Sequence, residues 1–406
     1  MVSQPRVIVD DEMIGNGRSD DGACAPSAAK RQAPQGVRTL PAVHVLGVGL
    51  ADADVRRDDV RLEELAYEVS RSALADAGIP REQLDSVVLG ASDELDGRPI
   101  SSMLMTAPAG GYLTDEIRVT GSGSAALALA VARQLSGDFN LSLVVSWCKP
   151  SKTEVSTVAN TRWEPFYHRD LGLDNDTTEG LFAQSVSARY NIPLSEVTDR
   201  AASAQIRAAR NPRGLSRLPQ TAEAVAASDY VSTPVRRGHC APHTDGAACL
   251  ILASPRWMAS HSGHAAYAQI SGIGWSTDSY RLDAARLSGV QSARSAWAAA
   301  LAMAGDGRHI DAVELETPTS FHEAALARAL PFGDAQISPS GGTFAQNPLV
   351  AAGLVNVVES VLQVSGRAGP VQVPRVRRAV AHSTYGFGHQ ASVVTVVDSV
   401  KEGPHA

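Results

Sequence analysis

The chain has 406 residues, of which 44% are hydrophobic and 19% charged, a composition typical of a globular protein with an ample core. Lysine and arginine number 36 against 43 aspartates and glutamates, so the formal charge is −7. This balance argues against nonspecific binding to nucleic acid or to a membrane surface, because both attract basic proteins. The length predicts one large α/β domain or two smaller ones.

Four cysteines are present, and none belongs to a C-x-x-C pair: Cys24, Cys148, Cys240 and Cys249. This pattern disfavours a disulfide framework and a structural zinc site. No apolar run reaches the roughly 18 residues of a membrane span. Acidic residues at 10–12 stand where a signal peptide would carry its apolar stretch, so we expect a cytoplasmic protein.

Residues 1–40 lack periodicity and are rich in Gly, Asp, Ser, Pro and Ala, which predicts a poorly ordered extension. The apolar run 42–49 predicts a buried strand that ends in a glycine turn. Helical spacing of apolar residues follows over 62–77, with Gly78 as the stop. A short strand is expected over 84–89.

An internal repeat is the most informative feature of the chain. The helix end and strand at 73–89 return in similar form at 300–315. Each copy is followed by a glycine turn and a second apolar helix, which ends at Gly137 in one copy and at Gly366 in the other. Order and spacing match together, and this predicts two structurally equivalent α/β halves.

We place the N-terminal half at 41–258 and the C-terminal half at 259–406. Residues 125–132 are apolar on every face, which predicts a helix buried on all sides, and the helix near 349–362 has the same character. These two helices would form the middle layer of a sandwich. The segment at about 138–240 has no counterpart in the second half, and we expect it to be a lid that sets specificity.

Four short motifs carry a family resemblance, which extends over about 42–399. They are Arg210-Asn211-Pro212, the segment 240–248, Pro339-Ser340-Gly341-Gly342 and Gly386-Phe387-Gly388. With these motifs the chain resembles the thiolase superfamily, in particular the branch of sterol-carrier-protein thiolases and lipid-transfer aldolases. The resemblance implies a duplicated five-layered αβαβα fold, a homodimer, and a thioester of coenzyme A or phosphopantetheine as substrate, with no permanently bound cofactor.

The catalytic positions of that family are replaced in this chain. Ser122 stands where the family has its nucleophilic cysteine, and Glu316 and Asn347 stand where it has two histidines. The last catalytic region contains His382 and Tyr385 and no cysteine. Ordinary thiolysis through a cysteine thioester is therefore not expected.

Ser122 is predicted to begin a buried helix, where backbone N–H groups stabilise negative charge. It is either an acyl nucleophile that needs an adjacent base, or only a helix cap. Glu316 and His382 are candidate proton-transfer groups, with His322 nearby, although Glu316 could instead pair with an arginine. Asn347 is a candidate hydrogen-bond donor to a thioester oxyanion.

Tyr385 precedes the glycine turn formed by Gly386 and Gly388, which the resemblance places close to the reacting centre. A tyrosine there resembles the lipid-transfer aldolases, because a phenol can exchange a proton with a β-hydroxyl group. The alternative is a tyrosine packed at the edge of the core.

Arginines are concentrated between positions 207 and 237, where only Glu223 and Asp229 are acidic. Their positive charge suits the phosphates of coenzyme A or of an acyl-carrier protein, and the alternative is a solvated helix face. The arginines are Arg207, Arg210, Arg213, Arg217, Arg236 and Arg237. For His239, Cys240, His243 and Asp245 we expect structural roles, and no metal site is predicted.

Three hypotheses follow. The first is an acyltransferase or condensing enzyme that acts on a CoA- or carrier-bound acyl group without a catalytic cysteine, in a setting such as secondary metabolism. The second is an aldolase-type lyase that uses Tyr385, with a small acyl-CoA-binding OB-fold protein as partner. The third is an inactive scaffold subunit of a thiolase-like complex.

Overall fold

The computed structural model describes residues 41–98, 100, 102–111, 113–305 and 307–400, so the predicted extension at 1–40 lies outside the described residues. The main strands of the N-terminal half are β1 (Val43–Leu50), β2 (Ser86–Gly90), β3 (Asp115–Val119), β4 (Leu141–Cys148) and β7 (Gly246–Ala253). Those of the C-terminal half are β8 (Ala268–Thr277), β9 (Ala312–Leu315), β10 (Gln336–Ile337), β11 (Arg378–Tyr385) and β12 (Ala391–Ser399).

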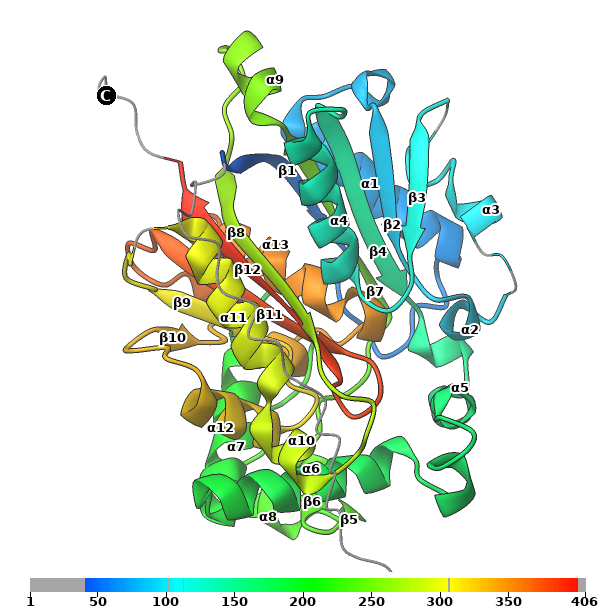
Figure 1. The fold of residues 1–406 in the computed structure, drawn as a ribbon, viewed down its shortest axis with the longest axis vertical. Helices are drawn as coiled ribbons and strands as arrows, with labels where there is room; N and C mark the ends of the chain where they lie inside the picture. Colours follow the sequence, from blue (N-terminus) through cyan, green and yellow to red (C-terminus); the bar gives the residue numbers. More distant parts are fainter. Residues whose placement is uncertain (1–40, 99, 101, 112, 306, 401–406) are drawn as a thin grey trace, which may run out of the picture. The chain divides into compact units, whose positions relative to one another are not determined.

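These strands form one sheet in the order β10-β9-β11-β12-β8-β1-β7-β4-β2-β3 (Figure 1). In the N-terminal half, β2 pairs in parallel with β3 and β4, while β7 is antiparallel to β4 and β1. In the C-terminal half, β9 pairs in parallel with β10 and β11, and β12 is antiparallel to β11 and β8. The two halves therefore have the same topology, which confirms the predicted duplication, and β1 joins them by pairing with β8.

The larger helices of the repeat are α1 (Leu62–Ala77) and α4 (Gly123–Ser136), with α11 (Gln291–Ala304) and α13 (Ala352–Val364) as their equivalents. Along β2, Val88 packs in the core that contains α4 and α13, whereas Val87 packs in the core that contains α1. This alternation follows from the two-residue period of a strand. The α1 and α11 layers are outside, and α4 with α13 forms the middle layer.

Glycines on the first strand of each half allow the outer helices to lie close to the sheet. A Cβ atom at Gly49 on β1 would overlap the carbonyl oxygen of Val69 in α1, and one at Gly274 on β8 would overlap that of Ala296 in α11. No residue with a side chain fits these contacts without displacing a helix. The same device in both halves is further evidence of the duplication.

The remaining elements lie mostly in the segment outside the repeat. It begins after β4, because β4 belongs to the sheet and has β11 as its equivalent, so the segment covers about 149–245 rather than starting at 138. It holds α5 (Val155–Arg162), α6 (Asn175–Tyr190), α7 (Leu194–Arg210), α8 (Ala222–Ala227), β5 (Tyr230–Ser232) and β6 (Val235–Arg236). Elsewhere are α2 (Asp93–Asp96), α3 (Ser102–Met105), α9 (Pro255–Ser260), α10 (Ala284–Gly289) and α12 (Ser320–Ala329).

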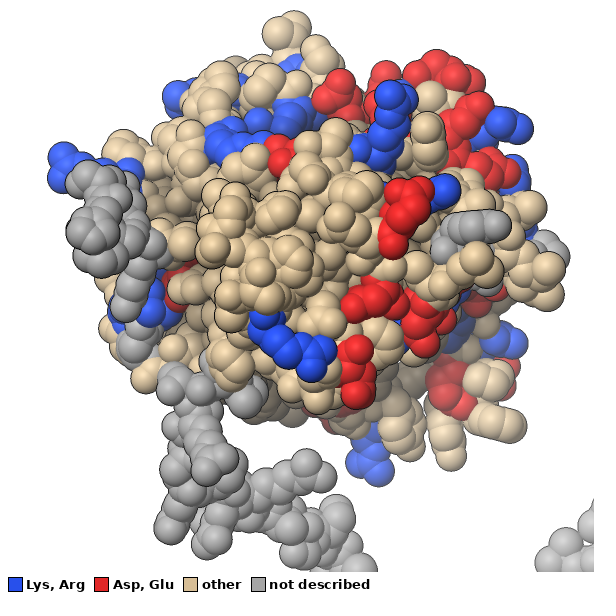
Figure 2. All heavy atoms as spheres, turned by 90° about the horizontal axis from the view of Figure 1, so that it is seen from above, with Lys and Arg blue, Asp and Glu red and all other residues tan. Residues whose placement is uncertain are grey.

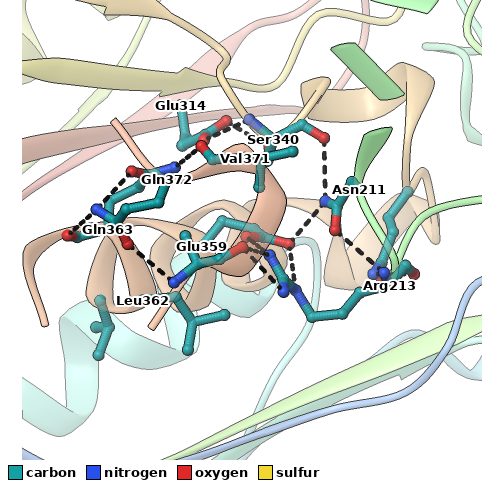
Figure 3. A network of polar contacts seen from close by, with 12 residues as sticks. Asn211, Arg213, Glu314, Ser340, Glu359, Leu362, Gln363, Val371 and Gln372 are labelled. Atoms are coloured by element: carbon teal, nitrogen blue, oxygen red, sulfur yellow. Dashed lines mark hydrogen bonds and ion pairs between the residues drawn. The ribbon is translucent and has the colours of Figure 1, made fainter. Parts of the chain in front are cut away.

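A buried ion pair ties this segment to the middle layer. Arg213, just after α7, donates to both carboxylate oxygens of Glu359 on α13, at 2.6 and 3.0 Å (Figure 3). Asn211 donates to Glu359 and to the carbonyl of Ser340. The hydroxyl of Ser340 in turn donates to Glu314 on β9. The network fixes the end of α7 against both β9 and α13.

Figure 2 shows positive and negative side chains scattered among uncharged ones on the face seen from the α9 end of the molecule. Within the described part of the chain, every helix falls short of the length and apolar character that a membrane span requires.

We predict that Gly274→Ala lowers the free energy of unfolding by about 2 kcal/mol or more, because the added methyl group must push α11 away from β8. Thermal and denaturant-induced unfolding of the purified variant measure the effect. Gly263→Ala is the matched control, since a Cβ there meets no atom within 4 Å. Equal stability of the two variants would contradict the close packing described.

Candidate functional site

Ser122 lies at the start of α4, as expected, and is buried. Its Oγ accepts a hydrogen bond from the Ser124 N–H at 3.2 Å, so it does cap the helix. The same Oγ lies 3.0 Å from the Oγ of Ser383 on β11. Ser122 is thus both a cap and a member of a hydroxyl pair that joins the two halves.

Glu316 extends this pair into a chain of three polar groups. It follows β9, whose parallel pairing with β11 continues with the Glu316 N–H donating to the His382 carbonyl at 3.1 Å, and this brings its carboxyl group beside Ser383. The Thr384 N–H donates to Glu316 Oε2, at 3.3 Å. Burial raises the pKa of Glu316 to about 8, although the neighbouring Ser383 hydroxyl and the Thr384 N–H lower it. The site therefore holds two hydroxyls and a carboxyl group that titrates near neutral pH.

Two glycines permit this approach of the halves. A Cβ at Gly123 would lie 2.6 Å from the Cβ of Ser146 and 2.9 Å from that of Leu354, and one at Gly353 would overlap the Ser383 hydroxyl. The first turns of α4 and α13 can therefore meet only because both positions lack a side chain. In the first turn of α4 the N–H groups of Ser124, Ala125 and Ala126 all donate to Ser122, which leaves the Gly123 N–H at the start of the helix as the one that could reach a ligand.

Tyr385 lies two residues after Ser383 on β11 and so shares its face of the sheet. A Cβ built on Gly121 would lie 3.2 Å from the Tyr385 ring, which places the tyrosine beside the turn that leads to Ser122. Partial burial raises the pKa of the Tyr385 phenol, while its hydrogen bond with Trp275 lowers it. The structure therefore brings Tyr385 into the same site as Ser122 and Glu316.

His382 points to the opposite face of β11. Its neighbour across the ladder is Val394, which packs in the outer core with α11, whereas the Ser383 neighbour Val393 packs against α4. His382 is buried, and burial lowers the pKa of its imidazole to about 3. The structure thus separates His382 from Ser122, and Ser383 stands in its place. The strand period alone predicts this separation, because Tyr385 and His382 are three positions apart and side chains on a strand alternate between its two faces.

Asn347 is buried and its main chain is fixed by a pair of hydrogen bonds with Thr244. The Asn347 N–H donates to Thr244 Oγ1 at 2.9 Å, and the Thr244 N–H donates to the Asn347 carbonyl at 3.1 Å. For the residues that the structure describes, no contact joins Asn347 to Ser122. The residue before Thr244, His243, lines a large cavity.

That cavity has a volume of about 600 Å³ and lies between α7, α8 and the segment that precedes β7. Both charged and apolar side chains line it, including Asp176, Leu215, Arg217, Arg237 and Phe344. This size is within the usual range for ligand pockets. Burial and the nearby Asp174 raise the pKa of Asp176.

The arginines predicted to bind phosphate lie in different surroundings. Arg207 donates to Glu323 and to the Ser338 carbonyl, and Arg213 is engaged with Glu359. Arg236 donates to Ser228 and lies over the Tyr230 ring. Arg210 is exposed at the end of α7. Of the six candidates, Arg217 and Arg237 line the cavity.

The glycine turn lies at the end of β11, as expected. Gly386 and Gly388 have φ angles of +80° and +52°, a region that L side chains rarely adopt. The carbonyl of Gly388 accepts a hydrogen bond from Arg286 at 3.1 Å, and the carbonyl of Phe387 accepts one as well. The turn is therefore held from outside by a guanidinium group.

The histidines and acids near 240 have structural partners. His239 accepts from the Arg236 N–H and contacts the hydroxyl of Thr198. Asp245 accepts from the Arg57 N–H and from Ser151. Cys240 lines the large cavity beside His243, and burial raises the pKa of its thiol to about 12.

Comparison with known proteins agrees with this architecture. Residues 321–398 match a family model described as a thiolase C-terminal domain-like region. An acetyl-CoA acetyltransferase of Methanothermobacter thermautotrophicus is 26% identical over 82% of this chain and 94% of its own length. One of Methanocaldococcus jannaschii is 27% identical over 46% of this chain and 50% of its own length.

Two solved structures share the fold at a TM-score of 0.71 and cover 89% of this chain: an Ltp2-ChsH2(DUF35) aldolase at 18% identity and human mitochondrial 3-ketoacyl-CoA thiolase at 16%. The match covers 98% of the former and 100% of the latter. The fold and the duplicated sheet are those of thiolase-like structures. Together with the sequence matches, they support a thiolase superfamily assignment.

We predict that Glu316 makes the unfolding free energy fall as the pH rises from about 6.5 to about 8, a range above the ordinary imidazole pKa of 6.5, in which the buried His322 and His382 no longer contribute a slope of opposite sign. Folded Glu316 keeps its proton up to about pH 8, whereas the unfolded carboxyl loses it near its ordinary value of 4.5. The unfolded state therefore gains stability over this window, by up to about 1.4 kcal/mol per pH unit for one proton. Denaturant-induced unfolding at several pH values measures the slope.

Glu316→Gln should make this slope less steep by the contribution of one proton, up to about 1.4 kcal/mol per pH unit. Glu314 continues to contribute, because burial and Glu359 raise its pKa to about 8 as well. Glu82→Gln, at an exposed glutamate, is the control and should leave the slope unchanged. A slope that is identical in all three proteins would refute the raised pKa of Glu316.

Proposed function

We propose that the chain is a thiolase-like acyl-thioester enzyme in which a Ser122–Ser383–Glu316 chain replaces the cysteine of the family. The observation that carries this proposal is the 3.0 Å contact between the two serine hydroxyls beside a buried carboxyl group. A serine hydroxyl is too weak an acid to attack a thioester unless a base removes its proton. Here the base acts through the intervening hydroxyl.

In the acylation step, Ser122 Oγ attacks the thioester carbonyl and its proton passes through Ser383 to the Glu316 carboxylate. The Gly123 N–H at the start of α4 donates to the oxyanion, since the next three N–H groups are engaged with Ser122. The C–S bond then breaks, the serine ester remains, and the departing thiolate takes up the proton. Asn347 remains a proposed further donor to the oxyanion, and Gly386 and Gly388 shape the turn beside it. An acyl acceptor completes the transfer.

We place the pantetheine arm of the substrate in the large cavity and its phosphates near Arg217 and Arg237. The position of the cavity supports this, because His243 in its wall is adjacent to Thr244, which holds Asn347. The acetyl-CoA acetyltransferase relatives are in accord with a CoA thioester. An acyl-carrier protein would present the same arm.

The predicted partners also remain proposals. β3 is at the end of the sheet, where an unpaired strand edge can pair with another chain, and this supports a homodimer. The name of the Ltp2-ChsH2(DUF35) aldolase pairs two proteins, and this supports a search for a small acyl-CoA-binding OB-fold partner here.

The second candidate is an aldolase-type lyase on a β-hydroxyacyl thioester. The position of Tyr385 beside Gly121 favours it, because the phenol lies next to the turn that carries Ser122. The tyrosine would remove the β-hydroxyl proton, the Cα–Cβ bond would break, and an aldehyde or ketone would leave without an acyl-enzyme.

We predict that acyl-CoA adds one acyl mass to the wild-type protein and none to Ser122→Ala. Intact-mass spectrometry after mixing detects the adduct. The rate of adduct formation should rise with pH up to about 8, as Glu316 ionises, and should fall at least about 100-fold in Ser383→Ala. Ser136→Ala, at an exposed serine, is the control.

Other outcomes decide between the remaining hypotheses. Carbonyl release without an adduct, lost in Tyr385→Phe, would establish the lyase instead. Inactivity with every thioester, alone and with a partner, would favour the scaffold. Turnover that is undiminished in both Ser122→Ala and Tyr385→Phe would refute both chemical proposals.

For substrate binding, we predict that Arg237→Ala raises KM for the CoA thioester by about tenfold with little change in kcat, because a charge-assisted contact to phosphate is lost. Steady-state kinetics measure the split. Arg71→Ala, on the exposed side of α1, is the control. An unchanged KM in Arg237→Ala would show that the phosphates of the substrate do not bind in the large cavity.

A further inference from the structure

Three side chains from distant parts of the chain meet on the outer side of β11: Glu179 from α6, His322 from α12 and His389 from the turn between β11 and β12. One ligand atom from each lies within 4.8 Å of the other two. His389 Nε2 lies 2.6 Å from Glu179 Oε1, and His322 Nδ1 lies 3.6 Å from Glu179 Oε2. We call this group the Glu179 cluster.

Several polar atoms in and beside the Glu179 cluster are buried without a hydrogen-bond partner. They are Oε2 of Glu179, Nε2 of His322 and both ring nitrogens of His382. A buried polar atom with no hydrogen bond costs about 1 to 3 kcal/mol, so each of these needs an explanation. Four unsatisfied nitrogen and oxygen atoms in one place point to a ligand that they share.

A small cavity lies at the same place. Its volume is about 30 Å³, and His322, His382 and His389 are among the residues that line it. The cavity is large enough for one water molecule or ion and too small for an organic substrate. Phe182 stacks on His322 and closes one side.

The contacts of His322 leave one ring nitrogen available to a cation. Its Nε2 is buried without a hydrogen-bond partner, while its Nδ1 is within reach of Thr319 and Glu179. Thr319 Oγ1, 3.0 Å from His322 Nδ1, orients the ring.

The other charged groups that line the cavity are Asp278 and Arg286. Arg286 directs its terminal nitrogens to the carbonyl groups of Tyr280, Arg281, Phe387 and Gly388. These carbonyl groups hold the guanidinium group in place, and the negative charge of Asp278 offsets its positive charge.

We propose that Glu179, His322 and His389 bind one divalent transition-metal ion of the Zn²⁺ type, with water in the remaining position. Two imidazoles and one carboxylate are a ligand set that zinc commonly takes, with distances of about 2.0 to 2.2 Å after a small closure of the cluster. The metal would satisfy the unpartnered Glu179 oxygen and a histidine nitrogen, and water bound to it would reach His382.

This inference is independent of the proposed function. The Glu179 cluster faces the outer side of β11, whereas Ser122, Ser383 and Tyr385 lie on the inner side. A metal there would tie α6 of the lid segment to the glycine turn that follows Tyr385. It would also hold His389 at its φ of +57°, which is uncommon for a residue other than glycine.

The test uses the full chain, purified with a tag that contains no histidine and stripped with a chelator. Zn²⁺ is titrated in competition with a chromophoric chelator, bound metal is counted by mass spectrometry after dialysis, and Co²⁺ provides a visible spectrum. We expect one ion per chain and a nitrogen- and oxygen-ligated Co²⁺ spectrum. Affinity should fall more than about 100-fold in His389→Ala and in Glu179→Gln.

The control is the double variant His261→Ala/His264→Ala, which removes two neighbouring histidines elsewhere and should keep wild-type affinity. Wild-type stoichiometry and the Co²⁺ spectrum stand even if a variant fails to fold. The proposal is overturned if the wild-type chain retains no Zn²⁺, or if the control variant loses the ion and Glu179→Gln keeps it. In that case the Glu179 cluster is only an ion pair.

Discussion

The contact between the first turns of α4 and α13 is the constraint on which the site depends. Gly123 and Gly353 allow the two helices to meet where any side chain would separate them. Since each helix belongs to one half of the duplication, this contact places Ser122 of the N-terminal half beside Ser383 of the C-terminal half. Neither half contains the site alone. The close packing of α1 and α11 on the outer faces holds both half-sheets in position around it.

A second constraint is the alternation of side chains along β11. Ser383 and Tyr385 point to the middle layer, and His382 points to the outer layer. One strand therefore carries two polar clusters with different chemistry. The inner one offers hydroxyl and carboxyl groups for proton transfer, and the outer one offers imidazoles and a carboxylate to a cation. In this thiolase-like fold, the serine and tyrosine of the proposed reacting centre and the histidine of the outer cluster therefore lie on opposite sides of the same strand.

Much of the architecture was predictable because it follows from local patterns. The repeat at 73–89 and 300–315 predicted the duplication, and the continuous apolar run at 125–132 predicted a helix in the middle layer. The predicted start of the segment outside the repeat is too early, because β4 pairs with β2 and β7 and belongs to the sheet. Of the residues that meet in the candidate site, motifs pointed to Ser122, Glu316 and Tyr385 but not to Ser383, although the strand period indicated it.

The amino-acid sequence by itself determined the superfamily resemblance and the order of elements, and it predicted a serine at the position of the catalytic cysteine, since these depend on residue types and on spacing along one chain. Only the tertiary structure decided which polar groups meet. Glu316 and Ser383 are 67 residues apart in the numbering and touch because β9 and β11 are parallel neighbours. Glu179 reaches His389 across 210 positions because α6 folds back on the final turn. Contacts of this range depend on packing, and no local pattern encodes them.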